Sequence, residues 1–384
     1  MPGHDPVTFA NELSAKLSTR SRHVCAVLGA GAARACGLPD VVMLQEKVVA
    51  ALESPHRERL QRQLIGRSLE QALTRVRRIA ALLDGDLELD GLTQASAVEL
   101  DDRICQAIVS ALELEKSSLE PVLRLASWAA RTDYRWPLEL FTVNYDLLLE
   151  TALEQLRVPY FDGFVGALAG RFHVDLVEGA PDEPQDWLPP SFVRLWKLHG
   201  SVNWAWDPTG SAEIVRLGGA VTQGRAAAIY PSDAKYDESR RVPFVVLQDR
   251  LRRALAQPET LTIITGYSFA DDHLNEMFFD AVIRRPRSEI IAFCYSEIPH
   301  ILKEHALRTP NLQVIAGHEA IIGSELKAWA EPDPTSPPPD DIWTGGAMAM
   351  SDFRALAAYL ARSSSPQREL EQRVSELLSK VTHG

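Results

Sequence analysis

The sequence has few cysteines and no long apolar run, and both absences restrict its class. Its four cysteines lie far apart, and none of them belongs to a Cys-x-x-Cys pair. We therefore expect neither a cysteine-ligated zinc ribbon nor a disulfide framework, and this predicts a reducing, cytoplasmic compartment. No apolar run approaches the roughly 20 residues that span a bilayer, and the N-terminus lacks the layout of a secretory signal. The sequence predicts no membrane segment.

An excess of basic residues is also missing. The chain has 40 Lys and Arg against 52 Asp and Glu, a formal net charge of −12. Because an acidic protein repels phosphate backbones, we expect no direct nucleic-acid binding. What is present suits a soluble α/β protein: 384 residues, of which 46% are hydrophobic and 24% charged, can fill one large domain or two ordinary ones.

Continuous apolar segments alternate with amphipathic ones along most of the chain. We expect strands at residues 23–28, 138–143, 193–198, 261–265 and 289–294, and helices at 146–156, 246–256 and 272–284. Apolar runs of this length are typical of strands buried on both faces of a parallel sheet. The alternation predicts an α/β fold with a Rossmann-like, doubly wound parallel sheet and helices on both faces.

Two segments interrupt this pattern and predict the domain organisation. Residues 43–137 have helical apolar spacing and a capping box at Ser68 and Gln71, which predicts an inserted helical subdomain within a main domain of residues 1–330. Residues 331–341 hold five prolines and four acids, so we expect a stiff linker over 331–345.

A C-terminal helical tail over residues 346–384 is expected to follow this linker, with helices at 351–362 and 366–381. The second helix carries one apolar stripe formed by Leu370, Val374, Leu377, Leu378 and Val381. Such a stripe either folds back onto its own domain or joins chains. The preceding linker favours the second interpretation, which predicts a homo-oligomer.

Polar and glycine residues follow the ends of the expected strands, where ligands bind in open α/β sheets. Gly29, Ala30 and Gly31 have the composition of a phosphate-binding turn, although a tight turn is the alternative. Arg34 is placed either to contact phosphate or simply as a surface arginine. Asn144 and Asp146 follow the second strand, and Asp146 alone could be a helix cap.

Histidine and a polar cluster follow two later strands. His199 stands beside Gly200, and a histidine at a strand end is a candidate general base. Gly266 and Ser268 are candidates to hold a ribose or phosphate. Asp271, Asp272 and His273 could ligate a metal, but capping of the next helix fits better, and nothing else completes a ligand set, so we expect no metal site.

These segments, in this order, resemble the boxes of the sirtuin superfamily over roughly residues 20–325. The turn at 29–31 with Gly37-Leu38-Pro39-Asp40 resembles its Gly-Ala-Gly…Gly-Ile-Pro-Asp box, and Asn144 with Asp146 resembles its Asn-x-Asp box. Leu198-His199-Gly200 is similar to the box of the general base, and Gly266 with Ser268 to the Gly-x-Ser box. The fuller forms around these boxes resemble the bacterial sirtuin-like NADases of antiphage defence.

The chain departs from the protein deacetylases of that superfamily at several positions. No cysteine lies between His199 and Cys294, where the deacetylases carry a four-cysteine zinc module. Val41-Val42 stands where they have Phe-Arg, Val143 where they have glutamine, and Ala33 where a serine is frequent. These differences disfavour acyl-lysine chemistry and predict a protein without zinc.

The resemblance implies hydrolysis of NAD+ to nicotinamide and ADP-ribose, with NAD+ as a consumed substrate and no other cofactor. It implies catalytic roles for Asn144, His199 and Asp146. It implies NAD binding by Gly29, Ala30, Gly31, Arg34, Asp40, Gly266, Ser268 and Asp271. It also implies antiphage defence by NAD+ depletion (abortive infection), gated by a HerA-type hexameric ATPase or, alternatively, an Argonaute-like protein. A sensor subunit for NAD or ADP-ribose is the main alternative, and an NAD-dependent protein deacylase is a further one.

Overall fold

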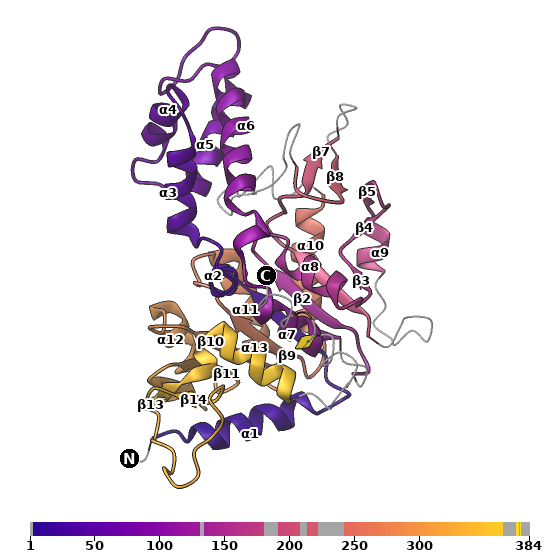
Figure 1. The fold of residues 1–384 in the computed structure, drawn as a ribbon, viewed down its shortest axis with the longest axis vertical. Helices are drawn as coiled ribbons and strands as arrows, with labels where there is room; N and C mark the ends of the chain where they lie inside the picture. The colour runs from indigo at the N-terminus through magenta and orange to yellow at the C-terminus, as the bar shows by residue number, and fades with distance from the viewer. Residues whose placement is uncertain are drawn as a thin grey trace.

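A nine-stranded sheet forms the centre of the molecule (Figure 1). The computed structural model describes residues 3–130, 134–179, 191–207, 213–221 and 242–363, together with 374, 375 and 377. The strand order is β13-β12-β11-β10-β9-β1-β2-β6-β3. The strands are β1 (Val24–Leu28), β2 (Leu138–Thr142), β3 (Tyr160–Phe161), β6 (Val193–Lys197), β9 (Leu261–Thr265), β10 (Glu289–Cys294), β11 (Leu312–Ala316), β12 (Glu319–Ile322) and β13 (Glu325–Ala328).

Every neighbouring pair from β11 to β3 is parallel, and only β12 and β13 are attached antiparallel. All five predicted strands are present, and β1, β2, β6 and β9 are buried along their whole length. The predicted α/β class with a Rossmann-like parallel sheet is therefore confirmed.

Helices cover both faces of the sheet, as the alternation of side chains along β1 demonstrates. Ala26 and Leu28 join one hydrophobic core, whereas Cys25 and Val27 join the other. The first core takes side chains from α1 (Pro6–Leu17), α2 (Ala30–Ala35), α7 (Glu120–Ala129), α8 (Leu148–Gln155) and α13 (Phe353–Arg362). The second takes them from α10 (Phe244–Ala256), α11 (Asp272–Arg284) and α12 (His300–Ala306).

The inserted helical subdomain projects away from the sheet (Figure 1). It consists of α3 (Val41–Ala51), α4 (His56–Gln63), α5 (Leu69–Leu82) and α6 (Gln94–Ala111). The predicted capping box starts α5: Ser68 Oγ accepts from the backbone of Gln71, whose side chain accepts from the Ser68 backbone. The subdomain is shorter than the predicted range 43–137, because α7 packs against α8 and α13 in the main domain.

A small antiparallel sheet, β4-β5-β8-β7, lies beside the main one. Its strands are β4 (Phe164–Val165), β5 (Ala169–Phe172), β7 (Trp204–Trp206) and β8 (Ile214–Leu217), and α9 (Val174–Glu178) follows β5. Phe164 contacts Phe172 and Trp204, and Trp204 contacts Phe244 of α10. Because aromatic side chains bury large areas, this cluster anchors the small sheet to the domain.

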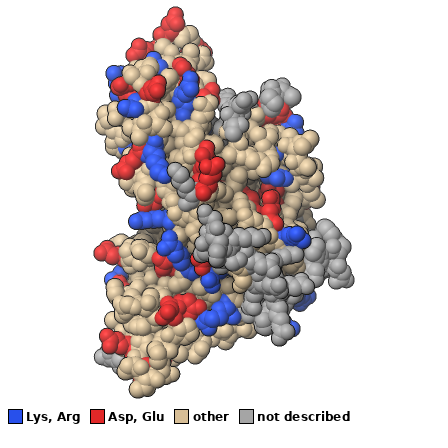
Figure 2. All heavy atoms as spheres, in the orientation of Figure 1, with Lys and Arg blue, Asp and Glu red and all other residues tan. Residues whose placement is uncertain are grey.

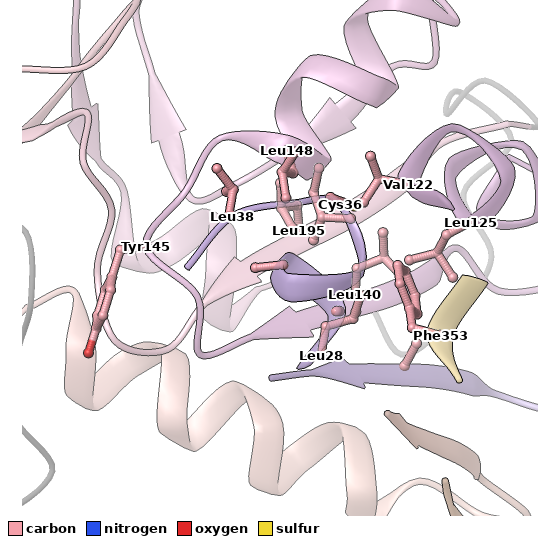
Figure 3. Packing of buried hydrophobic residues seen from close by; sticks show 14 of the residues in the cluster. Leu28, Cys36, Leu38, Val122, Leu125, Leu140, Tyr145, Leu148, Leu195 and Phe353 are labelled. Carbon is pink, nitrogen blue, oxygen red and sulfur yellow. The ribbon is translucent and has the colours of Figure 1, made fainter. Parts of the chain in front are cut away.

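The C-terminal segment differs from the predicted linker and assembly tail. Arg362 of α13 forms two hydrogen bonds with Asp341, Ile342 is buried, and a short hairpin of β14 (Trp343–Thr344) and β15 (Ala347–Met348) precedes the 3-10 turn Ala349–Ser351 and α13. Phe353 lies among Leu28, Leu125 and Leu140 in the core (Figure 3).

Val374 and Leu377 also pack against this core. At these two positions the stripe that suggested an assembly element packs on the chain's own domain, as a helix does when apolar surface is within reach. The rest of the predicted helix at 366–381 lies outside the described residues.

The turns after β1 and β9 meet backbone to backbone. A Cβ atom on Gly31 would lie 2.7 Å from the Gly266 Cα, and one on Gly266 would lie 2.4 Å from the Ala32 backbone nitrogen. Gly266 also has a φ of +64°, a conformation that favours glycine. Two adjacent strands therefore end in turns that only glycine allows to approach this closely.

We predict that Gly266→Ala destabilises the protein more than Gly85→Ala does. Gly85 has a similar φ of +62° but open space around it, so its replacement costs only the conformational strain, about 1–2 kcal/mol. At Gly266 the backbone clash adds about 1–3 kcal/mol. Urea unfolding of both variants measures the difference, and equal losses would contradict the close-contact argument.

Candidate functional site

Four loops converge at the carboxyl edge of the sheet. They follow β1, β2, β6 and β9, which are neighbours in the order β9-β1-β2-β6 and run parallel, so all four end at the same edge. Direct contacts join these loops in a closed circuit: the β1 loop touches those of β9 and β2, the β2 loop touches that of β6, and the β6 loop touches that of β9. Segments separated by more than 100 residues thus form one site.

The β1 turn is bonded to β9 through its own backbone. The Gly29 N–H donates to the Thr265 carbonyl at 3.0 Å, and the Gly31 N–H donates to the Gly266 carbonyl at 2.8 Å. The sequence suggested that these glycines clear space for a pyrophosphate, whereas here they clear space for the β9 turn. Ala30 begins α2 at the same edge.

Arg34 and Asp40 lie on the same side of the site and pair with each other at 3.1 Å. Asp40 is also the N-cap of α3, since its carboxylate accepts from the Met43 N–H at 2.9 Å. Arg34 is exposed, so a bound phosphate would compete with Asp40 for its guanidinium.

Asn144 and Asp146 have different environments although only one residue separates them. Asn144 is half-buried, and its Nδ2 donates to the Gly29 carbonyl at 3.0 Å. Asp146 is buried and accepts from the Leu148 N–H at the start of α8. Burial raises the pKa of Asp146, while Lys197 and the Leu148 N–H oppose that rise. Both residues line a small hollow with Thr142 and Glu150.

Lys197 at the end of β6 is the residue that sequence reasoning missed. Its buried Nζ donates to the carbonyl of Asp146 and to the Glu150 carboxylate at 2.9 Å. A lysine in a strand that is buried along its whole length is an uncommon choice, because a buried ammonium needs a partner. The presence of this lysine was the signal that the sequence offered. Through these bonds Lys197 fixes the loop that carries Asn144 and Asp146.

Tyr145 connects this loop to the inserted subdomain. Its hydroxyl donates to the Glu70 carboxylate in the first turn of α5. Burial and the charge of Glu70 raise the pKa of Tyr145 well above its usual value, so the phenol is neutral and serves as donor. The subdomain is thereby tied to the residue between Asn144 and Asp146.

His199 and Asp271 face each other across the edge of the sheet. The His199 Nε2 lies 3.4 Å from the Asp271 Oδ2, and both side chains are largely buried. Burial by itself raises the pKa of Asp271, but His199 and the backbone N–H groups of residues 273 and 274 outweigh it and hold the pKa below its ordinary value. An ionised carboxylate therefore stands beside the imidazole.

The other residues of the β9 loop have separate positions. Ser268 is exposed, and Gly266 forms the turn against Gly31. Asp271 caps α11 by accepting from the His273 and Leu274 N–H groups, the structural role that the sequence offered as the alternative to metal binding. Over the part of the chain that the structure describes, no group of three or more His, Cys, Asp or Glu side chains could hold a metal ion.

The surface contains both signs of charge, without a continuous basic face in the view of Figure 2. Among the described residues, no helix combines the length and apolarity that crossing a bilayer requires. The expected absences of membrane and nucleic-acid partners stay predictions.

The fold and the convergent loops define a class: an open α/β protein whose candidate ligand site lies at the carboxyl edge of its parallel strands. The SIR2-like domain family matches residues 138–315, from the start of β2 to the end of β11. This match supports a sirtuin-like superfamily assignment and an NAD-related function for that region. It includes Asn144, Asp146, His199, Gly266, Ser268 and Asp271, whereas the β1 turn lies before it. No curated protein matches the chain.

We predict that Lys197→Met lowers the free energy of unfolding by about 3–5 kcal/mol, because it leaves the Glu150 carboxylate unpaired in the interior. Arg284→Met is the matched control. It breaks an exposed ion pair with Asp280 and should change stability by less than about 0.5 kcal/mol. Urea unfolding measures both, and a Lys197→Met protein as stable as the control would refute the role of the buried pair.

Proposed function

We propose that the chain is an NAD+ glycohydrolase that cleaves the bond between nicotinamide and ribose. The observation that carries the proposal is the circuit of contacts that brings Asn144, Asp146, His199 and the two glycine turns to one edge of the sheet. The SIR2-like match over residues 138–315 supports NAD as the ligand. NAD+ enters as a substrate, and the reaction needs no redox partner.

The chemistry requires a water molecule to replace a neutral leaving group. The bond from ribose C1′ to the nicotinamide nitrogen breaks, the water oxygen bonds to C1′, and nicotinamide leaves with the electron pair. His199 takes the proton of the water as general base, a role worth about 10²–10⁴-fold in rate. Asn144, fixed through Gly29, orients the ribose hydroxyls or the water, and Asp146 aligns the nicotinamide carboxamide.

The remaining NAD contacts follow the sequence assignment. We assign the pyrophosphate to Gly29, Ala30, Gly31 and Arg34, with Asp40 paired to Arg34, and the adenosine half to Gly266 and Ser268. The Gly29 and Gly31 N–H groups already donate to β9 and to the turn that follows it, so they are not free to bind a phosphate. Binding of the phosphate would therefore depend mainly on Arg34 and the start of α2.

A role in antiphage defence, with a partner that gates the activity, completes the proposal. It rests on the resemblance to bacterial sirtuin-like NADases, and a HerA-type ATPase is the partner we favour over an Argonaute-like protein. The contact between Tyr145 and Glu70 offers a route for gating, because a partner that moves α5 would also pull on the loop of Asn144. Homo-oligomerisation stays a prediction, and Val374 and Leu377 of the proposed assembly stripe pack against their own domain.

We predict that Asn144→Ala and His199→Ala each reduce NAD+ hydrolysis by at least about 10²-fold, because they remove the group that orients the reactants and the base. Nicotinamide and ADP-ribose are quantified by chromatography at high enzyme concentration, with an acyl-lysine peptide in a parallel reaction. His300→Ala, which removes an exposed histidine, is the matched control and should keep wild-type turnover.

Each possible result of this assay selects one function. Near wild-type turnover by either folded variant would refute its assigned role. Binding of NAD+ by the wild type without any product would favour the sensor subunit. Consumption of NAD+ only together with the acyl-lysine peptide would favour the deacylase.

We predict that the purified protein contains no stoichiometric zinc and that chelators leave its unfolding temperature unchanged. The small sheet between β3 and α10 is held by aromatic contacts among Phe164, Phe172, Trp204 and Phe244, so it needs no metal for its stability. Elemental analysis checks this prediction. One zinc ion per chain would contradict it.

A further inference from the structure

The contact between His199 and Asp271 joins two loops that follow non-neighbouring strands of the sheet. His199 follows β6 and Asp271 follows β9, and β1 and β2 lie between these strands. Three strand spacings of about 4.8 Å place the ends of β6 and β9 about 14 Å apart. The two loops must therefore bend toward each other over the ends of β1 and β2, where Gly29 and Asn144 lie. The contact forms above the proposed reaction centre.

The two oxygens of Asp271 have different partners. Its Oδ1 accepts from the backbone N–H groups of His273 and Leu274, at 3.0 and 3.3 Å, as the N-cap of α11. Its Oδ2 faces the His199 Nε2 at 3.4 Å. The cap fixes the carboxylate on the first turn of a 13-residue helix, so the acid has little freedom to turn away from the histidine.

The loop that carries Asp271 is itself held from below. The Tyr267 hydroxyl donates to the Asp271 carbonyl and to the Asn275 Oδ1, and the Asn275 Nδ2 donates to the Phe269 carbonyl at 2.8 Å. Asn275 is buried. These bonds hold the backbone of the loop at Asp271 in place.

We propose that Asp271 is a positioning residue that holds His199 in the tautomer and orientation a general base requires. The inference rests on the proposed hydrolysis of NAD+ and replaces the ribose contact that the sequence suggested for Asp271. A carboxylate beside Nε2 favours the tautomer that carries its proton on that nitrogen. Nδ1 is then the unprotonated atom that accepts the proton of the attacking water.

The geometry explains why the acid is suited to this role. The titratable groups that face Asp271 are His199 from the β6 loop, Tyr145 from the β2 loop and Tyr267 from its own loop. Burial raises the pKa of both tyrosines, so they are neutral. Among the described residues, Asp271 is the carboxylate paired with the His199 imidazole, and it compensates the positive charge that His199 gains when it accepts a proton.

Asp271→Asn is the decisive variant, because asparagine caps helices as well as aspartate does. Its Oδ1 keeps the bonds to His273 and Leu274, and its amide nitrogen takes the place of Oδ2. An N–H donor then faces Nε2, so Nε2 must become the acceptor and the proton moves to Nδ1. Inversion of the tautomer removes the base, and we expect kcat to fall by about 10²–10⁴-fold with KM nearly unchanged.

The experiment has an arm that does not depend on activity. Nuclear magnetic resonance of the full chain with 15N-labelled histidine, at alkaline pH, reports which ring nitrogen carries the proton, and the spectrum of His199→Gln assigns the signal. The wild type should show the proton on Nε2, and Asp271→Asn should show it on Nδ1. Asp272→Asn, which removes an exposed carboxylate from the adjacent position, should resemble the wild type in both arms.

Asp271→Ser is the second variant if asparagine impairs folding. Serine also caps the helix but is too short to reach the imidazole, so it should leave a mixture of tautomers and a smaller loss of kcat. An unchanged tautomer in both variants would overturn the inference. A rise of KM at constant kcat would overturn it too and restore the ribose contact. If the wild type shows the expected tautomer but no NAD+ hydrolysis, the proposed function fails while the positioning of His199 stands.

Discussion

The close approach of two glycine turns is the constraint on which the rest of the site depends. Gly29 and Gly31 after β1 meet Gly266 after β9, with backbone hydrogen bonds between the turns and no room for a single Cβ atom. Because β1 and β9 are adjacent, this contact sets where the β9 loop begins, and so where Asp271 can meet His199. The Gly29 carbonyl also receives the amide of Asn144. One backbone contact thus bears on the positions of Asp271, which faces the proposed base His199, and of Asn144, which carries the proposed orienting amide.

Buried charge organises the other half of the site. Lys197 lies under the loop of residues 144–146, where it binds backbone carbonyl oxygens and pairs with Glu150. A buried ion pair is seldom the most stabilising solution, since removing two charges from water is costly, but it fixes a single geometry when each partner is satisfied. Tyr145 in the same loop donates to Glu70 of the inserted subdomain. The loop is therefore attached both to the sheet and to the inserted subdomain.

The small sheet and the C-terminal segment are both attached to the main domain by apolar packing. Contacts among four aromatic side chains anchor the small sheet, whose edge strands are short, to α10. At the C-terminus, α13 buries Phe353, Leu356 and Leu360 in the core that α7 and the sheet also line. A proline-rich segment leads from β13 toward α13, and Ile342 at its end is buried. Composition alone therefore did not distinguish a free linker from a segment that packs on the domain.

The sequence by itself determined the α/β class, five of the parallel strands and the capping box of α5, because these depend on local periodicity and on hydrogen bonds between residues three apart. It also located the strand ends where Asn144, Asp146, His199 and Gly266 lie, since ligand-facing residues follow buried strands. Only the tertiary structure decided how these ends connect: the pair of His199 with Asp271, the lysine under the Asn144 loop and the return of α13 to its own core. Those contacts join residues 47 to more than 300 positions apart, as in Lys197 with Glu150 and Arg354 with Ala35, and no local pattern records them. These residues come together because the strands lie in the sheet in an order that differs from their order along the chain.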